Sequence, residues 1–332
     1  MSEEEAAVDH QKDQRHIPVL CEEVLRLLQP KNNEIFIDGT FGAGGHTLGL
    51  LKSCDCRVLA LDRDPTAIEC AEELASKFTP RLSLSHRSFS QLQCAALEFG
   101  LKSVDGVLLD VGLSSMQIDN SNRGFSFQHD GPLDMRMSCV GPTASDVVNT
   151  FDEDQLADIF LSLGEVRHAR KIAGEIMGQR VKKPFTRTKE LADLIIRVMG
   201  GRRWGEIHPA TQAFQALRIY VNDELTELKK GLQAAEAILK PEGRLVVITF
   251  HSLEDRIVKH FLRERSGKAD HGSRYKPSPR RTFSAPSFRI INSRPLTPNE
   301  SEINVNPRAR SARLRAAQRT EAPIWKEREE TF

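Results

Sequence analysis

Two carboxylates and a glycine-rich turn near the start of the chain have the spacing of a nucleoside-binding site. An apolar run at residues 35–37 leads to Asp38, and four glycines lie within residues 39–45. A buried strand that passes through such a turn into a helix lets the backbone approach a nucleotide-like ligand closely. A second apolar run, residues 58–61, ends at Asp62, where a carboxylate can accept hydrogen bonds from ribose hydroxyls. The pattern predicts a nucleoside cradle, and the alternative is a glycine-rich turn without a ligand.

The composition of the turn favours S-adenosylmethionine over NAD(P) or FAD, the other common ligands of such sheets. Residues 42–47, GAGGHT, lack the third glycine of the dinucleotide pattern. Asp38 suits the ammonium group of a methionine moiety, a cation that a pyrophosphate ligand does not have. We therefore expect this methyl donor as the cofactor. No metal site is expected, because the six cysteines include no CxxC pair.

The elements around the cradle have the order of a parallel α/β sheet. Strands are expected near residues 35–37, 58–61, 82–89 and 107–109, and they end at Asp38, Asp62, Phe89 and Asp110. Helical periodicity separates them. The carboxyl edge of such a sheet is where ligands bind. At this edge Phe89 either stacks on an adenine ring or packs in the core, and the sequence favours neither role.

The alternation of strands and helices stops after the fourth strand. Residues 114–137 are polar and aperiodic, which is typical of a functional loop or of disorder, and two phenylalanines argue against disorder. Residues 143–199 show only helical patterns. A strand at 244–250, a helix at 254–265 and a strand near 288–291 follow. The predicted fold is a Rossmann-like α/β sheet with an inserted all-helical domain.

Composition and charge narrow the class of protein. The 332 residues are 39% hydrophobic and 28% charged, as in an ordinary soluble enzyme. The net charge of +1 hides ten Lys/Arg against two acids at residues 259–294, and five Arg with no acid at residues 306–320. This predicts a surface for a polyanion, or else a merely solvated face. With no apolar run of membrane-spanning length and an acid-rich leader unlike a targeting peptide, we expect a cytoplasmic protein.

Longer motifs point to one family. They are HIPVL, DGTFGAGGHT, LDRDP, DVGLSSMQID, RGFSF, DGPLDMRM, FQALRIYVNDEL, FHSLEDRIVK and NPRARSARLRAA. Across about residues 16–319 the chain thus resembles the bacterial small-subunit ribosomal RNA methyltransferase H family (RsmH, also called MraW), which has a mitochondrial relative. The resemblance implies methyl transfer from S-adenosylmethionine to N4 of a cytidine in the decoding region of 16S ribosomal RNA. The implied partner is this RNA within a small ribosomal subunit or a late precursor, while the oligomeric state stays open.

The resemblance also implies a domain plan and a set of donor-binding residues. The plan is a disordered leader (1–15), a discontinuous methyltransferase domain (16–137 and 205–319), a helical insertion expected to recognise RNA (138–204) and a tail (320–332). The implied donor-binding residues are Gly44, Gly45, His46, Asp62, Phe89, Asp110 and Gln117.

The group that accepts the proton of the target amine is not assigned by these motifs. A cytosine N4 amine is a poor nucleophile, so acceptors must hold its protons while the ring is fixed in line with the methyl group. Many amino-methyltransferases place an acid or Asn before two prolines and an aromatic, whereas Asp110 here precedes VGLSS. Asp110 and His251 are candidates. For the segment after His251, a helix-capping role of Ser252 and Asp255 is an equal alternative.

Six further side chains are candidate contacts for the substrate. Arg123, Asp134 and Arg136 close the loop over the base or else form an internal salt-bridge network. Arg308, Arg310 and Arg313 are expected to contact phosphate. No core role is expected for so many guanidinium groups in residues 306–320, and the alternative is that a few of them cap helices of the sheet domain.

Two other classes of protein use parts of the same pattern. A dehydrogenase would share the sheet, but no separate domain with a catalytic His or a Tyr-Lys pair is recognisable. A non-catalytic RNA-binding protein would need only the basic C-terminal segment.

Overall fold

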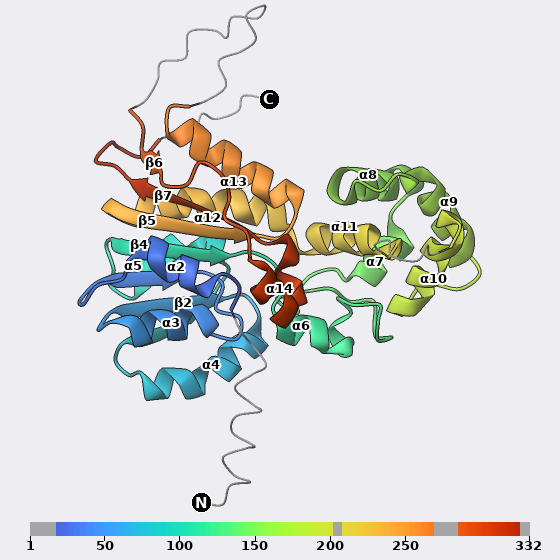
Figure 1. The fold of residues 1–332 in the computed structure, drawn as a ribbon. Coiled ribbons are helices and arrows are strands. Elements are labelled where there is room, and N and C mark those ends of the chain that lie inside the picture. Colours follow the sequence, from blue (N-terminus) through green and yellow to red (C-terminus); the bar gives the residue numbers. More distant parts are fainter. Residues whose placement is uncertain (1–17, 202–207, 269–284, 326–332) are drawn as a thin grey trace, which may run out of the picture. The chain divides into compact units, whose positions relative to one another are not determined.

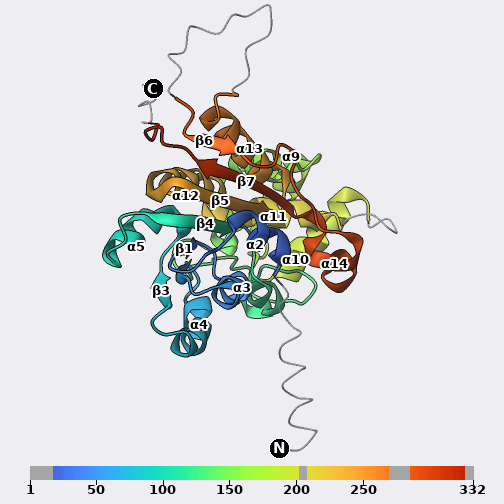
Figure 2. The ribbon, with the colours of Figure 1, turned by 60° about the vertical axis from the view of Figure 1, so that its left-hand side comes forward.

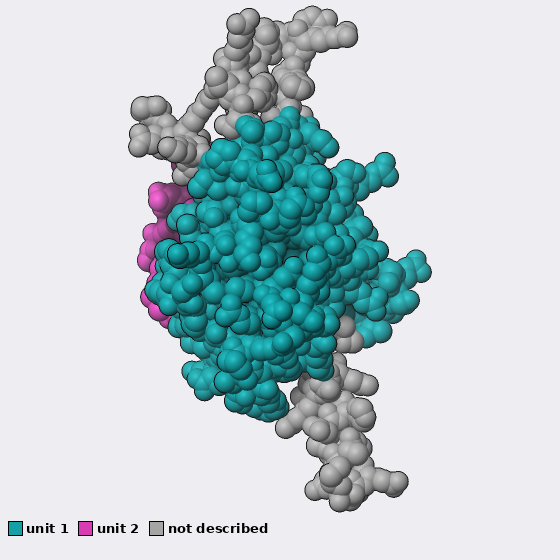
Figure 3. Space-filling view, turned by 90° about the vertical axis from the view of Figure 1, so that its left-hand side faces the viewer, with its two compact units in different colours: residues 1–112, 227–332 teal, residues 113–226 magenta. Residues whose placement is uncertain are grey.

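The chain forms two compact units. The computed structural model describes residues 18–201, 208–268 and 285–325. Residues 1–112 and 227–332 make up the first unit, and residues 113–226 make up the second; Figure 3 colours them teal and magenta. The predicted disordered leader, residues 1–15, lies outside the described residues.

The first unit is built on a seven-stranded sheet with the order β3-β2-β1-β4-β5-β7-β6. Its strands are β1 (Ile35–Asp38), β2 (Arg57–Asp62), β3 (Leu82–His86), β4 (Val104–Asp110), β5 (Leu239–Thr249), β6 (Phe288–Ile290) and β7 (Arg313–Arg319), as labelled in Figures 1 and 2. Strands β1 to β5 pair in parallel, and β7 is antiparallel to both β5 and β6. The predicted α/β class is confirmed, with its four early strands and its late C-terminal strands.

Helices cover both faces of this sheet. One face carries α2 (Cys21–Leu28), α3 (Gly45–Ser53) and α4 (Pro65–Lys77), and the other carries α5 (Leu92–Glu98), α12 (Glu224–Ile238) and α13 (Ser252–Arg265). Shorter elements are η1 (Phe89–Gln91), α14 (Glu300–Val305) and η3 (Pro307–Ser311). Leu108 faces the first group of helices, while Val107 and Leu109 face the second. Because both faces of the sheet are covered by helices, residues 107–109 of β4 form an unbroken apolar run.

Two arginines of the arginine-rich segment, residues 306–320, are buried in the first unit. This corrects the expectation that these arginines have no core role. Arg315 and Arg319 of β7 are only 9% and 6% exposed. Arg315 donates two hydrogen bonds to Asp255 of α13, at 2.7 and 3.0 Å. Arg319 donates to the backbone carbonyls of Glu236 and Ser287, at 3.1 and 3.0 Å. Guanidinium groups are tolerated here because acceptors from distant segments satisfy them.

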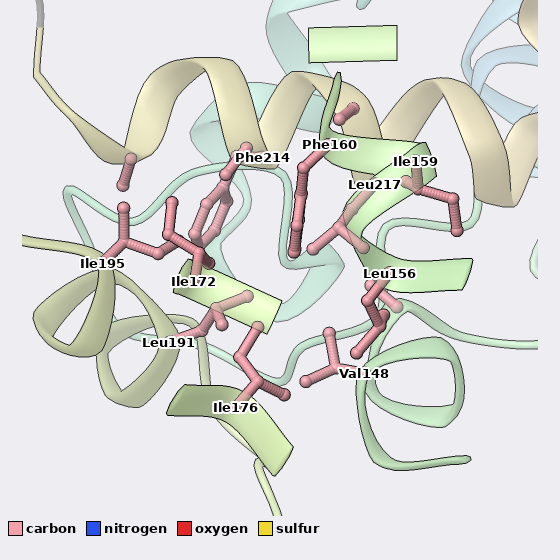
Figure 4. Close-up of a cluster of buried hydrophobic side chains, with 14 of the residues drawn as sticks. Val148, Leu156, Ile159, Phe160, Ile172, Ile176, Leu191, Ile195, Phe214 and Leu217 are labelled. Carbon is pink, nitrogen blue, oxygen red and sulfur yellow. The ribbon is translucent and has the colours of Figure 1, made fainter. Parts of the chain in front are cut away.

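In the part of the second unit that the structure describes, the named elements are all helices. Its elements are α6 (Ser115–Asp119), η2 (Ser121–Arg123), α7 (Ala144–Thr150), α8 (Glu153–Gly164), α9 (Ala169–Arg180), α10 (Thr188–Met199) and α11 (Ala210–Asn222). Figure 4 shows side chains of α7 to α11 meeting in one apolar core. The predicted insertion, residues 138–204, lies inside this unit. The unit is wider, because its core also takes in Phe125 and Leu133 before the insertion and Phe214 and Leu217 after it.

The long amphipathic segment before β5 is divided into α11 and α12. The division falls at Asp223, whose φ is 48°. A left-handed residue ends one helix before the next begins. Within the described ranges, no helix is both long enough and apolar enough to cross a membrane.

Removing Arg315 should destabilise the first unit. Arg315→Ala leaves the carboxylate of Asp255 without its bidentate partner, and breaking a buried pair costs about 3–5 kcal/mol. Urea unfolding measures the loss. Arg313→Ala is the matched control, because Arg313 contacts the same carboxylate at 3.3 Å but is 48% exposed, and we expect it to cost less than about 1 kcal/mol. Equal losses in the two variants would contradict this account of the tail.

Candidate functional site

The glycine turn between β1 and α3 is shaped by packing from within the chain. Gly42 and Gly44 have φ values of 53° and 79°, in the left-handed region that favours glycine. A Cβ atom on Gly44 would lie 2.5 Å from Cζ of Phe41, and one on Gly45 would lie 2.9 Å from Cβ of Pro18. Glycine is thus required at both predicted donor-binding positions for the turn itself to form. The turn places the first helical residues of α3 at the carboxyl edge of the sheet.

Asp62 lies where the sequence places it, at the end of β2 beside the turn. Its Oδ2 atom accepts a hydrogen bond from the Gly42 N–H, and its Oδ1 atom accepts one from the Asp64 N–H, both at 2.8 Å. Each oxygen keeps a second lone pair. Burial raises the pKa of Asp62 to about 6, although these two backbone hydrogen bonds act to lower it. The carboxylate is therefore fixed in position and can accept two more donors, such as a pair of hydroxyl groups.

Asp38 is tied into the fold by hydrogen bonds at the end of β1. It is 1% exposed, and it accepts hydrogen bonds from the Thr40 N–H at 3.1 Å and from the Thr47 hydroxyl at 2.7 Å. Burial raises the pKa of Asp38. Both oxygens thus already accept hydrogen bonds from the turn and from α3. The carboxylate joins β1 to the first turn of that helix, and its expected contact with a ligand ammonium group stays a prediction.

His46 and Asp110 form a buried ion pair at the same edge. The Nε2 atom of His46 lies 3.4 Å from Oδ2 of Asp110, and His46 is 6% exposed. Burial lowers the pKa of His46, but Asp110, the Cys21 thiol and the charge of Asp38 outweigh burial and raise it to about 10. The ring is therefore an imidazolium at neutral pH.

The polar atoms of this pair are incompletely satisfied. Across the described ranges, neither ring nitrogen of His46 makes a well-formed hydrogen bond, and Oδ1 of Asp110 makes none. Buried polar atoms without partners are rare and require an explanation, such as a ligand or an ordered water. Together with Asp62 and the glycine turn, they fit a ligand that carries hydroxyl and amino groups, as S-adenosylmethionine does.

Phe89 is held by two residues of α12 that the sequence reading missed. A Cβ atom on Gly231 would lie 2.4 Å from Cδ2 of Phe89, so the ring packs directly on this glycine. One turn earlier, Oε2 of Glu227 accepts hydrogen bonds from the hydroxyls of Ser88 and Ser90, the second at 2.7 Å. Glu227 and Gly231 therefore fix the loop that carries Phe89. The sequence does contain a signal, because Gly231 interrupts a helical pattern. A glycine inside a helix costs roughly 1 kcal/mol relative to alanine, so its presence indicates a packing or functional requirement.

His251 begins α13 as its N-cap. Its Nδ1 atom accepts the N–H of Glu254 at 3.4 Å, and Oε2 of Glu254 accepts the N–H of His251 at 3.2 Å. Nε2 of His251 lies 3.0 Å from the second oxygen of Glu254. The capping alternative is therefore right in kind but placed one residue too late in the chain, since His251 and Glu254 form the box expected of Ser252 and Asp255. A catalytic role of His251 stays a prediction.

Four predicted site residues belong to the second unit. Gln117 is the N3 residue of a capping box on α6 and is 5% exposed. Arg136 donates two hydrogen bonds to Asp134, at 2.9 and 2.7 Å, and Arg123 donates to the Arg136 carbonyl at 3.0 Å. Asp134 is partly buried, which would raise its pKa, but the hydrogen bonds from Arg136 outweigh this and lower it. These contacts are those of the internal-network alternative, and roles toward donor or base stay predictions.

The candidate arginines of the tail lie near the same sheet edge as the cradle. Arg308 and Arg310 are exposed residues of η3, directly before β7. Because β7 is antiparallel, Arg313 pairs with Thr249 at the carboxyl end of β5. Ligands of α/β sheets bind at this edge. These three arginines therefore lie near the ligand-binding edge, and their contact with phosphate stays a prediction.

The chain matches a known family over nearly its whole length. The sequence model described as the MraW methylase family matches residues 13–320. A relative from Caulobacter vibrioides, Ribosomal RNA small subunit methyltransferase H, is 53% identical over 310 residues, covering 93% of this chain and 97% of the relative. Proteins of the same name from Xanthobacter autotrophicus and Bradyrhizobium diazoefficiens are also 53% identical, covering 93% and 94% of this chain and 88% and 94% of their own. These matches confirm the resemblance drawn from the motifs.

Donor binding should depend on the ionised form of Asp62. Its pKa is about 6 in the donor-free chain, so affinity should be flat above pH 7 and fall by up to about tenfold per pH unit well below 6. Asp62→Ala should weaken binding at neutral pH by at least about tenfold, since a hydrogen bond to a charged group contributes about 1.5–3 kcal/mol. Calorimetric titration of the donor between pH 5 and 8 measures both effects. Asp62→Asn is the control and should remove the pH dependence; a wild-type affinity independent of pH would contradict the assignment.

Loosening the Phe89 loop should also weaken the donor site. Glu227→Ala removes the acceptor of two hydroxyls, and Gly231→Ala displaces the ring, so each should raise the donor Kd by about tenfold, equivalent to one net hydrogen bond. Glu227→Gln, which keeps an acceptor oxygen, should recover part of the affinity. Calorimetry and thermal melting of each variant, with Lys230→Ala as an exposed control on the same helix, give the measurement. A lowered melting temperature with an unchanged donor Kd would show that Glu227 only stabilises the fold.

Proposed function

Because this chain belongs to the MraW methylase family, we propose that it methylates N4 of a cytidine in the decoding region of 16S ribosomal RNA. The protein is a methyltransferase and its methyl donor is S-adenosylmethionine. The RNA target is supported by relatives at 53% identity whose names state small-subunit ribosomal RNA. The site observation that carries the proposal is the unsatisfied His46–Asp110 pair beside the glycine turn and Asp62.

The bound donor would supply an electrophilic methyl group on a sulfonium, and the residues of the chain would hold it in place. Asp62 accepts hydrogen bonds from the ribose hydroxyls, Gly44 and Gly45 allow close approach of the backbone, and Phe89 borders the adenine. Gln117 completes the donor contacts in this proposal.

Asp110 is the better of the two candidate acceptors for the target amine. His46, whose pKa is raised to about 10, lies 3.4 Å from one oxygen of Asp110. The other oxygen has no hydrogen-bond partner. Such an oxygen can hold a proton of the amine and so turn the nitrogen lone pair toward the methyl group. Nδ1 of His251, in contrast, is engaged in capping α13.

The remaining parts of the proposal concern the RNA. The substrate is this RNA within a small ribosomal subunit or a late precursor, in the cytoplasm. The helical insertion, residues 138–204, recognises RNA, while Arg308, Arg310 and Arg313 contact phosphate near the sheet edge. Arg123, Asp134 and Arg136 hold the loop after β4 in shape around the base.

Labelled methyl transfer tests this function directly. Purified 30S particles and free 16S RNA are each incubated with the protein and labelled donor, and the product nucleosides are separated. We expect N4-methylcytidine from the subunit. Asp110→Asn should lower kcat by about 10²–10⁴-fold, the range for loss of one proton-transfer group, with little change in RNA affinity. Label in a different nucleoside would reject the N4 assignment, and RNA binding without any transfer would favour a non-catalytic RNA-binding protein.

A further inference from the structure

Cations greatly outnumber acids on one segment of the helical unit. Residues 167–189 contain eight Lys/Arg and a single acid, Glu175. This segment comprises α9, the loop after it and the first residues of α10. A helix face that is merely solvated usually alternates charges of both signs. The segment therefore has an excess of positive charge that its own sequence does not balance.

Four of the eight cations have partners within the unit. Arg180 donates to the carbonyls of Val148 and Phe151 at the end of α7, at 2.9 and 2.5 Å. Three more form ion pairs, Arg187 with Asp130, Lys183 with Glu190 and Arg170 with Asp154. The Arg170 pair is weak, because its atoms are 3.6 Å apart and both side chains are 84% exposed.

The other four cations are exposed, and their side chains make no hydrogen bond or ion pair with any residue that the structure describes. They are Arg167, Lys171, Lys182 and Lys189. Within residues 113–201 and 208–226, no contact of the fold accounts for a positive charge at these positions. A positive surface without internal partners is the usual footprint of a protein that binds nucleic acid.

The loop between α9 and α10 holds these side chains on a fixed support. Phe185 is 1% exposed, its N–H donates to Oδ1 of Asn149 at 2.9 Å, and its carbonyl accepts from Ser145 and Asn149, each at 2.7 Å. The inward-facing groups of the loop are thereby used for packing. Lys182 and Lys189, on either side of Phe185, are left exposed to solvent.

The four charges are also spread out in a way that suits a chain of phosphates. On α9 the buried residues are Ile172, Ala173 and Ile176, whereas Lys171 is exposed. Gly178, two turns after Lys171 and hence on the same side, is open, since a Cβ atom there would meet nothing within 4 Å. A helix of 12 residues is about 18 Å long. Positive charges before, along and after it can therefore contact several successive phosphates.

We propose that Arg167, Lys171, Lys182 and Lys189 form a phosphate-binding face that anchors the RNA substrate. This inference rests on the proposed function and adds to it the side chains that anchor the substrate. Phosphate contacts fix the position of an RNA without reading its sequence. The face should therefore contribute to substrate affinity and leave donor binding unchanged.

The test replaces the four residues by Gln in the full-length protein. The matched control replaces Lys31, Lys52, Arg57 and Lys102, exposed cations near the opposite edge of the sheet, where the strands start. RNA binding is measured across a salt series with free 16S RNA and with 30S particles. We expect the log–log salt slope to flatten by about 0.7 for each lost phosphate contact, thus by up to about 3 in total. The KM for the particle should rise at least tenfold, with kcat and donor Kd within twofold of wild type, while the control keeps the wild-type slope.

The outcomes separate this proposal from the function on which it rests. Equal slopes for the variant and the control would overturn the phosphate-binding face, even if wild type methylates the subunit normally. Loss of binding to anionic lipid vesicles or to an acidic protein, with RNA binding unchanged, would overturn it as well. If wild type binds RNA and the variant alone loses the slope, but wild type transfers no methyl group, the face stands and the proposed function fails. The half variants Arg167→Gln/Lys171→Gln and Lys182→Gln/Lys189→Gln should each give about half of the effect and protect the test against misfolding of the quadruple variant.

Discussion

The buried carboxylate of Asp38 joins the three elements on which the candidate donor site depends. It accepts hydrogen bonds from Thr40 in the turn and from Thr47 on α3, and the Thr40 hydroxyl in turn accepts the N–H of Asp110 at 2.7 Å. One network therefore links the ends of β1 and β4 to the start of α3. Burying a carboxylate is costly unless hydrogen bonds compensate it, and Thr40, whose N–H compensates this one, also holds the backbone of Asp110 through its hydroxyl. The positive charge of His46 interacts favourably with the carboxylates of both Asp38 and Asp110.

Much of the sheet could be predicted from sequence because its determinants are local. Apolar runs that end in an acid place Asp62 and Asp110 at one edge, and the loss of strand patterns after Asp110 identifies the helical part. What could not be predicted depends on partners far apart in the chain. Glu227 lies 139 residues from Ser88, and Arg315 lies 60 residues from Asp255. Neither the residues around Ser88 nor the spacing of the arginines contains information about these partners.

Two other differences between the predicted and the observed structure concern where elements begin and end. The N-cap of α13 is His251 and not Ser252, because an imidazole nitrogen can accept the N–H of Glu254 as a hydroxyl does. Sequence patterns leave element ends uncertain by a residue or more. The helical unit extends past its predicted limits because apolar side chains such as Phe125 and Leu217 pack in its core. From their polarity and lack of periodicity, residues 114–137, which contain Phe125, are identified only as a loop.

The position of β7 sets the order in which the sheet can be completed during synthesis. Among the described residues, β6 pairs only with β7, and β7 also covers the outer edge of β5. Strand β7 therefore inserts between two strands that precede it in the chain and are already made. Until then the edge of β5 is open and Asp255 lacks its guanidinium partner. An open edge and an unpaired buried charge are both hazards for a nascent chain. A chain released before Arg313 would thus keep both the edge of β5 and the carboxylate of Asp255 uncovered.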